Sequence, residues 1–377
     1  MIVTATLILA AGSAICWLLY FYPYLLYPLA LRLLSKRPIH AASADLSVSL
    51  VFCAYNEIDC LPRKIQNLRA LKRSKPNLQI LAYDDGSTDG TFELLSSVPD
   101  VLTTFRGPGR TGKAAGMKQL VQQARGDILV FTDADVELQE DSIDRLLPYY
   151  GDPDVGGICC SVKMLSVEHS ATSHTGSLYW SWDDRIQQLE SATGNVMGAS
   201  GAMFSVRREL YPEFPDTVQD DFTVSMSVIF QGKRLIKAPD VMAFTNSVSR
   251  SSDELRRKVR IGARAYHTHR FLLPQLRRMS ARDRFKYVSH KFLRWFGGLF
   301  VLLGALFGLA AVATLSASVA GLLLLAALIA AALSVRVQRG HLGKAGQIGL
   351  ATFATQFGVF QGMRGRTVAL WARANSR

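Results

Sequence analysis

The segment Gln-Ile-Leu-Ala-Tyr-Asp-Asp-Gly-Ser-Thr-Asp-Gly, residues 79–90, decides the fold class of this chain. A run of mostly apolar residues ends at Tyr83 and passes directly into carboxylates, small polar residues and glycine. This order predicts a buried strand that ends in a tight turn. Carboxylates at the carboxyl end of a strand can accept hydrogen bonds from a nucleobase or a ribose. Capping of the next helix explains the segment alone nearly as well, so its surroundings have to decide.

Short apolar runs alternate with amphipathic stretches on both sides of this segment. We expect strands at residues 46–54, 79–83, 101–105, 128–132 and 155–162, and helices at residues 57–71, 91–97, 113–124 and 142–150. Strands that alternate with helices predict an α/β fold whose mostly parallel sheet is covered on both faces. Ligands of such sheets gather beyond the carboxyl ends of the strands.

A second acidic pair, Asp133 and Asp135, closes the strand expected at residues 128–132. Two carboxylates one residue apart can hold a hard divalent cation, Mg²⁺ or Mn²⁺, which would neutralise a leaving diphosphate. Chance and helix capping also produce such pairs. A pair that ends one strand, after another strand that ends in Asp84 and Asp85, is much stronger evidence for a nucleotide site.

The loop at residues 106–113 is basic and rich in glycine. It lacks the register of a Walker phosphate loop, because Ala114 follows Lys113 and no strand leads directly into the loop. Lys113 begins an expected helix, where its charge and the helix amides could contact a diphosphate. A solvated basic loop is an equally good interpretation.

Small residues fill the stretch at residues 194–202, which includes Gly198, Ser200 and Gly201, and they would let the chain pass close to a sugar. Further along, Asp220 and Asp221 stand at the head of an expected helix. An acidic pair near the metal could supply the general base for an acceptor hydroxyl. Alternatively, the pair only complements the helix dipole.

Basic residues then gather at residues 256–264. On a helix, Arg257, Arg260 and Arg264 share one face and could clamp a diphosphate or a phospholipid headgroup. A patch that touches only lipid is the alternative, and the two roles are compatible.

Long apolar stretches indicate a multi-pass membrane protein. Residues 1–35 contain an almost uncharged run longer than the about 20 residues that cross a bilayer, without the basic start of a secretory signal. Arg32, Lys36 and Arg37 follow this expected transmembrane helix. The positive charges predict that the following domain, residues 46–270, lies in the cytoplasm. We expect the membrane to be the inner membrane of a bacterial cell.

Three further segments follow this domain. Residues 280–295 interleave basic and aromatic side chains and predict an amphipathic helix in the membrane interface. Residues 296–336 are long and apolar enough for two transmembrane helices. Residues 345–363 contain glutamines and have basic residues at both ends, so we expect a third C-terminal membrane or re-entrant segment there.

The composition suits a membrane enzyme better than a nucleic-acid-binding protein. Of the 377 residues, 49% are hydrophobic, and Lys and Arg outnumber Asp and Glu by 43 to 30, a mixture suited to an anionic membrane surface. The basic residues form no single stripe. The five cysteines show no zinc-binding spacing and are expected to be reduced thiols. A transporter is disfavoured by the small number of spans and their lack of acidic residues.

Taken in order, the motifs above resemble those of the membrane-bound family 2 (GT2) inverting glycosyltransferases, which include cellulose synthases, hyaluronan synthases and poly-N-acetylglucosamine synthases. The resemblance covers residues 46–264. It rests on Ala54-Tyr55-Asn56-Glu57, Asp84-Asp85-Gly86-Ser87, Gly112-Lys113-Ala114, Asp133-Ala134-Asp135, residues 198–202, and Asp220-Asp221-Phe222.

The resemblance implies a GT-A fold and a metal-dependent hexosyltransferase that uses a nucleotide sugar, UDP-linked by analogy. Asp85 would contact the base, and Asp133 and Asp135 would hold the ribose and the Mg²⁺ or Mn²⁺ ion. Asp221, at the aspartate of the family's T-E-D motif, would deprotonate the acceptor beside Asp220, so that direct attack inverts the anomeric carbon. The remaining nucleotide-sugar positions implied are Ala54, Tyr55, Glu57, Lys113, Arg257 and Arg260.

Two positions depart from the family's Q-x-x-R-W motif, because Arg257 replaces the Gln and Ile261 replaces the Trp. In polymerising members that Trp lies beneath the acceptor, so its absence puts processive synthesis in doubt. We therefore expect transfer of one or a few sugars to a membrane-associated acceptor, in surface polysaccharide or glycolipid assembly. A small processive polysaccharide synthase is an alternative. A non-catalytic nucleotide-binding receptor is another, although it would not require Asp221.

Overall fold

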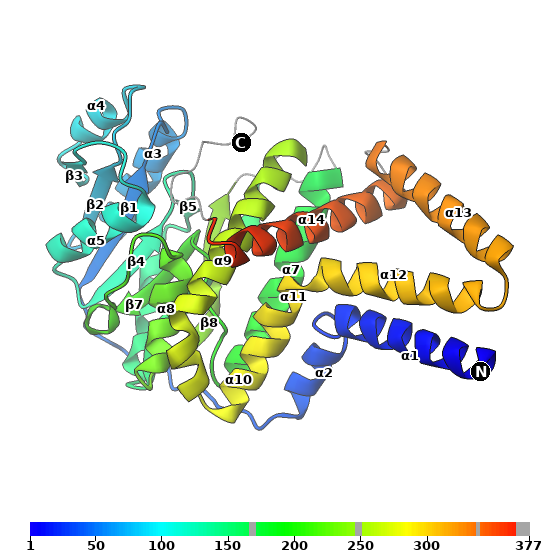
Figure 1. Cartoon of the computed structure of the whole chain (residues 1–377). Helices are drawn as coiled ribbons and strands as arrows, with labels where there is room; N and C mark the ends of the chain where they lie inside the picture. The colour runs from blue at the N-terminus through cyan, green and yellow to red at the C-terminus, as the bar shows by residue number, and fades with distance from the viewer. Residues whose placement is uncertain (166–170, 246–250, 337–339, 367–377) are drawn as a thin grey trace.

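A central sheet organises the larger part of the molecule (Figure 1). The computed structural model describes residues 1–165, 171–245, 251–336 and 340–366. Within these residues, eight strands form one sheet in the order β3-β2-β1-β4-β7-β6-β8-β5. The predicted α/β class with a mostly parallel sheet is confirmed.

The first half of the sheet is parallel. It consists of β1 (Val48–Ala54), β2 (Gln79–Asp84), β3 (Thr103–Arg106) and β4 (Ile128–Thr132). Burial of β1, β2 and β4 on both faces explains their nearly continuous apolar runs, whereas β3 at the edge of the sheet is partly exposed. Because parallel strands end at the same edge, β2 and β4 deliver their acidic residues to one side of the sheet.

The second half contains strands that the sequence analysis did not predict. They are β7 (Met203–Arg207), β8 (Arg234–Thr245) and the short β5 (Glu137–Leu138), which join β6 (Val155–Met164). β7 runs antiparallel to β4, and Met203 at its start pairs with Thr132 at the end of β4. The loop before β7 therefore lies beside the Asp133 segment.

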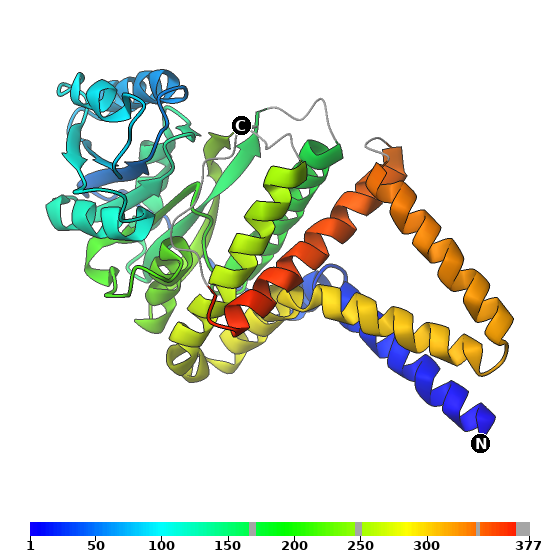
Figure 2. The ribbon, with the colours of Figure 1, turned by 45° about the horizontal axis from the view of Figure 1, so that its top comes forward.

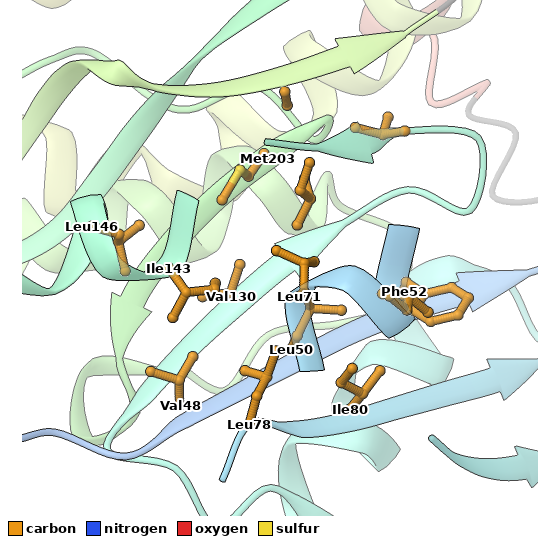
Figure 3. Close-up of a cluster of buried hydrophobic side chains, with 14 of the residues drawn as sticks. Val48, Leu50, Phe52, Leu71, Leu78, Ile80, Val130, Ile143, Leu146 and Met203 are labelled. Carbon is orange, nitrogen blue, oxygen red and sulfur yellow. The ribbon is translucent and has the colours of Figure 1, made fainter. Parts of the chain in front are cut away.

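Helices cover both faces of the sheet. On one face lie α3 (Leu61–Ser74), α4 (Thr91–Ser96) and α6 (Ser142–Leu146), and on the other lie α5 (Lys113–Gln123), α8 (Asp220–Phe230) and α9 (Ser251–Arg278). Figure 3 shows the first core, in which Leu50, Phe52 and Ile80 from the strands meet Leu71 of α3. Burial of such side chains is the main stabilising contribution to the domain.

A helical part projects from one side of the sheet domain (Figures 1 and 2). It contains α1 (Ile2–Phe21), α12 (Gly297–Ala313), α13 (Ala317–Arg336) and α14 (Gly340–Met363). α1 lies along α12. Among the described residues, α1 and residues 317–334 of α13 are each long and apolar enough to cross a membrane.

The N-terminal stretch differs from the single helix expected over residues 1–35. α1 ends at Phe21, a turn follows, and α2 (Leu26–Leu33) continues in a new direction and packs on α7 (Ala171–Ala192). Pro23 lies in this turn, where its ring and missing N–H disfavour a continuous helix.

The expected interfacial helix is also divided. It comprises α10 (Ala281–Tyr287), a π-helical turn η3 (Val288–Phe292) and the short α11 (Leu293–Trp295). A bend of 66° separates this segment from α12, and the pair together is long and apolar enough for one broken span or a re-entrant loop. Two transmembrane helices were expected at residues 296–336. Of these, α13 is long and apolar enough to cross a membrane by itself, whereas α12 is so only together with the segment at residues 281–295.

The last helix, α14, is packed against α9 through contacts between backbones. A Cβ atom at Gly262 of α9 would collide with the carbonyl of Thr355, and one at Gly362 of α14 would lie 2.6 Å from the Ala263 carbonyl. Such close approach is possible only without side chains.

Candidate active site

The acidic motifs meet at the edge where β1, β2 and β4 end. Asp84 closes β2 and Asp133 follows β4, while the loop before β7 and the start of α8 bring Gly201 and Asp221 to the same edge. The two carboxyl groups expected from the strands and the acidic pair far along the chain are therefore neighbours in space.

Asp85 fixes the glycine-rich loop at residues 106–113. Its carboxylate is only 2% exposed and accepts hydrogen bonds from the backbone N–H groups of Thr111 (2.7 Å) and Gly112 (3.0 Å) and from the Thr111 hydroxyl (2.9 Å). Gly86 adopts φ +77°, and a Cβ there would lie 2.9 Å from the backbone of Gly109. The loop is thus held firmly at the start of α5. The expected contact of Asp85 with a base stays a prediction.

The turn after β1 forms one wall of the candidate site. The Arg110 guanidinium lies 3.8 Å from the ring centroid of Tyr55, an arrangement favourable for a cation and an aromatic face. Asn56 has φ +54° and accepts a hydrogen bond from the Thr88 backbone (2.9 Å). Glu57 of the same motif is buried. These contacts bind the β1 turn to the β2 turn.

The ammonium group of Lys113 lies among carboxylates. Its Nζ is 2.5 Å from Oδ1 of Asp133 and 3.9 Å from Oδ2 of Asp220. Burial alone would lower the pKa of Lys113, but Asp133, Asp220 and Asp221 outweigh burial and raise the pKa. Lys113 therefore stays charged and reduces the repulsion among these acidic groups. The expected contact of Lys113 with a diphosphate stays a prediction.

Asp221 points at the small-residue loop. A Cβ at Gly201 would lie 3.0 Å from its Oδ2 and 3.5 Å from Nζ of Lys113. Burial and the neighbouring Asp220 raise the pKa of Asp221 to about 6, although Lys113 acts in the opposite direction. A carboxylate with a raised pKa in a crowded acidic site is typical of a general base.

The loop at residues 198–202 is shaped by α8. Gly198 adopts φ +89°, and a Cβ there would lie 2.5 Å from the ring of Phe222. The Ala199 backbone donates a hydrogen bond to the Ser225 hydroxyl (3.0 Å), and Ser200 is partly buried in the same loop. Helix α8 therefore carries Asp221 and also positions this loop.

Helix α9 holds the segment that leads into α8. Arg264 donates a hydrogen bond to the Val218 carbonyl (2.8 Å), and Thr268 accepts one from the Gln219 backbone (2.9 Å). Arg257 instead pairs with Glu254 of its own helix (2.8 Å), two turns before Arg264. Arg260 is partly buried one turn before Arg264. Arg264 therefore connects α9 to the loop before Asp220.

Sequence reasoning missed Lys64 of α3. This lysine is 1% exposed, and its Nζ donates to the Val136 carbonyl (2.5 Å) beneath the Asp133–Asp135 segment. Burial lowers the pKa of Lys64 to about 8, against the raising effect of Asp133 and Asp135. A signal was present, because Lys64 stands at an apolar position of the stripe formed by Leu61 and Leu68.

The donor set fits a metal held partly by substrate. In the described part of the chain, no three His, Cys, Asp or Glu side chains are grouped as a metal site. Asp133 and Asp135 offer two partly buried carboxylates, and Mg²⁺ commonly uses one or two carboxylates together with phosphates and water. The Lys113 ammonium already occupies a cation's place between Asp133 and Asp220.

The whole fold has a counterpart among solved structures. A mannosyltransferase from Pyrobaculum calidifontis, PcManGT, solved with GDP-Man and Mn²⁺, superposes with a TM-score of 0.72 over 95% of this chain and 99% of that one, at 20% identity. This likeness shows the fold, which is GT-A-like α/β.

A family model matches part of this chain. The model of Glycosyl transferase family 2 matches residues 49–214, and the chain therefore carries a family 2 glycosyltransferase domain. Relatives include a beta-monoglucosyldiacylglycerol synthase of Synechocystis sp., 29% identical over 44% of this chain and 38% of that protein. A poly-beta-1,6-N-acetyl-D-glucosamine synthase of Staphylococcus aureus is 24% identical over 56% of this chain and 52% of the relative. The chain thus matches about half or less of the length of these relatives.

Proposed function

We propose that this chain is a membrane-bound, metal-dependent, inverting hexosyltransferase that moves a sugar from a nucleotide-diphosphate sugar, UDP-linked, to a membrane-associated acceptor. The observation that carries the proposal is the convergence of Asp221 and Lys113 on Gly201. A carboxylate with a raised pKa faces a position without a side chain, and this position can admit a sugar hydroxyl. The relation to a glycolipid synthase supports an acceptor at the membrane.

In the proposed reaction, Asp221 accepts the proton of the acceptor hydroxyl as its oxygen attacks the anomeric carbon. The bond from this carbon to the diphosphate oxygen breaks, and the nucleoside diphosphate leaves with the bonding electrons. Asp220 lies beside Asp221 and favours its proton uptake by repulsion. Because attack and departure occur on opposite faces, an α-linked donor gives a β-linked product.

Other residues bind the donor in this proposal. Tyr55 and Arg110 offer a flat, cationic surface for the base, and Asp85 keeps the loop beside it in place. Arg260, one turn before Arg264 on α9, would contact the diphosphate. Asp133 and Asp135 would hold Mg²⁺ or Mn²⁺, which when bound neutralises charge on the leaving diphosphate.

The test is transfer by the purified full chain in detergent with native lipid. It is incubated with a panel of radiolabelled nucleotide sugars, with Mn²⁺, with Mg²⁺ or with EDTA. We expect label in a lipid extract with one donor and a divalent ion, and loss of label with EDTA. Asp221→Asn should lower the rate by about 10²-fold or more, as expected for loss of a general base.

Asp100→Asn is the matched control, because the Asp100 side chain is 71% exposed. It should leave transfer unchanged. Donor consumption that is independent of metal, or that persists in Asp221→Asn, contradicts the proposal.

A processive synthase is the second candidate, favoured by the relation to the poly-beta-1,6-N-acetyl-D-glucosamine synthase. The same incubation separates the two. Label in high-molecular-weight polymer supports synthesis of a chain, whereas label in small lipid products supports single transfer.

A further inference from the structure

A groove runs between α1 and the α10–η3–α11 segment, away from the acidic site. Its volume is about 490 Å³, within the range of about 300–1,000 Å³ typical of ligand sites. It is lined by Leu19, Tyr22, Ala281, Arg284, Phe285, Val288, Ser289 and Leu293. One wall therefore belongs to a candidate membrane span, and the other to the segment that leads into α12.

The lining is apolar except at one point. Phe285 and Val288 are 37% and 45% exposed, and Leu19 and Leu293 extend the apolar surface onto both neighbouring helices. Arg284 supplies the one charged side chain of this lining, and it is exposed. An apolar groove with a single guanidinium matches a ligand that has a long hydrocarbon part and a negatively charged head group.

The wall formed by α10 and η3 is held in place because its buried polar residues contact α7. His290 is fully buried, with Nδ1 2.8 Å from Oε1 of Glu190 and Nε2 3.0 Å from Oδ1 of Asp183. Lys286 donates to the Glu190 carbonyl (2.7 Å). His290 and the Arg294 guanidinium oppose the effect of burial and hold the pKa of Asp183 well below its usual range. The opposite face of the helix is left to line the groove.

The π-helical turn η3 contains residues of both faces. Val288 lies on the groove, while both ring nitrogens of His290 are within hydrogen-bond distance of carboxylates of α7. π-turns are rare and occur frequently at functional sites. The hydroxyl of Tyr22, just after α1, is hydrogen-bonded to that of Ser289 in the turn (3.0 Å). This hydrogen bond joins the two walls of the groove.

We infer that this groove binds one anionic phospholipid, with an acyl chain along Phe285, Val288 and Leu293 and with its phosphate at Arg284. A hydrocarbon chain removes the exposed apolar side chains from water, and a phosphate can accept several hydrogen bonds from a guanidinium. A second protein copy on the same groove would have to supply its own acceptor for the Arg284 guanidinium. The inference does not depend on the proposed sugar transfer.

The test is photo-cross-linking of the full chain in nanodiscs with a phospholipid that carries a diazirine on one acyl chain. Phosphatidylglycerol and phosphatidylcholine with the same chains are compared, and labelled residues are identified by mass spectrometry. We expect phosphatidylglycerol to label residues 281–293 at least fivefold more than phosphatidylcholine does. Arg284→Gln should reduce this labelling to the phosphatidylcholine level.

Two further variants complete the test. Val288→Trp should fill the groove and lower labelling of residues 281–293 by both lipids, with little effect on labelling of α13. Arg73→Gln, which removes an exposed charge at the end of α3, should change neither. Unfolding temperatures of all variants check that each is folded. Equal labelling by the two lipids, label spread evenly over the apolar helices, or cross-linked dimers through this segment would overturn the inference.

Discussion

The ring of Phe222 fills the space that a side chain at Gly198 would need, since a Cβ at Gly198 would lie 2.5 Å from the ring. The backbone of Phe222 also donates a hydrogen bond to Oδ1 of Asp221 (2.8 Å). The loop that faces the proposed acceptor and the proposed base are therefore held by one residue.

This contact predicts that Gly198→Ala lowers both stability and transfer. The added methyl group must displace the ring, and overpacking of this kind typically costs about 1–3 kcal/mol of the free energy of unfolding. The positive φ of Gly198 adds strain of about 1 kcal/mol. Thermal unfolding in detergent and the rate of transfer measure the two effects.

Gly232→Ala is the matched control, because Gly232 has φ +76° but nothing lies within 4 Å of its Cβ position. It carries the backbone strain alone and should retain full transfer. If the two variants lose equal stability, the ring contact has no energetic weight.

The raised pKa of Asp221 predicts an acidic limit to activity. A base must be ionised, and the pKa of Asp221 is raised to about 6, first by burial and then by Asp220. We expect kcat/KM to fall tenfold for each pH unit below about 6. Asp220→Asn removes the repulsion, so the limit should move to lower pH even if the rate also changes. A profile that is flat down to pH 4.5, or unmoved by Asp220→Asn, would contradict the role of Asp221.

The same group affects stability in a defined direction. Its pKa is higher in the folded chain than the about 3.9 of an unfolded aspartate, so the folded state binds more protons between these values. The contribution of Asp221 to stability is therefore greatest at low pH and is lost as pH rises towards about 6. Asp221→Asn should unfold at the same or a higher temperature than the unsubstituted protein at pH 7.5, while transfer is lost.

The position of Lys113 predicts an effect on metal affinity. Its ammonium lies 2.5 Å from the Asp133 carboxylate, where it repels a second cation. Lys113→Met should tighten Mn²⁺ binding by about tenfold or more without donor, since a unit charge at this range acts strongly at a partly buried site. Calorimetric titration with Mn²⁺ measures this directly. Transfer should nevertheless fall, because the acidic groups lose their counter-charge.

Lys118→Met serves as the control on the same helix. Lys118 pairs with Asp216 (2.6 Å) outside the acidic cluster, so its removal should leave Mn²⁺ affinity unchanged. If Lys113→Met leaves the Mn²⁺ affinity unchanged, the Lys113 ammonium does not compete with the metal ion for the same carboxylates.

In the parallel half of the fold, β1, β2 and β4 could be predicted because they are mostly apolar and are followed by polar turns. β7 could not be predicted, because a segment of five residues that follows a run of small residues is too short to show the alternation of a strand. Its direction is set by pairing with β4. The orientation of the basic residues in residues 280–295 was also beyond the sequence. Lys286 and His290 turn inward because Asp183 and Glu190 of α7 lie opposite them, and that helix was not predicted.

The candidate site shows a similar division. Strand ends revealed Asp85, Asp133 and Asp135, because topology brings such ends together. The partners of each carboxylate depend on loop geometry, so the hydrogen bonds from Thr111 and Gly112 to Asp85 could not be predicted. Arg257 shares a helix face with Arg264, but its contact with Glu254 depends on where α9 begins.

The backbone contacts between α9 and α14 restrict how this protein can change over evolutionary time. Gly262 and Gly362 each lie against a carbonyl group of the other helix, and α9 also holds the loop before Asp220. A larger residue at either position would push the helices apart and move that loop. Among homologous sequences, we expect these two positions to stay small together, or to enlarge only where the facing residue has become smaller.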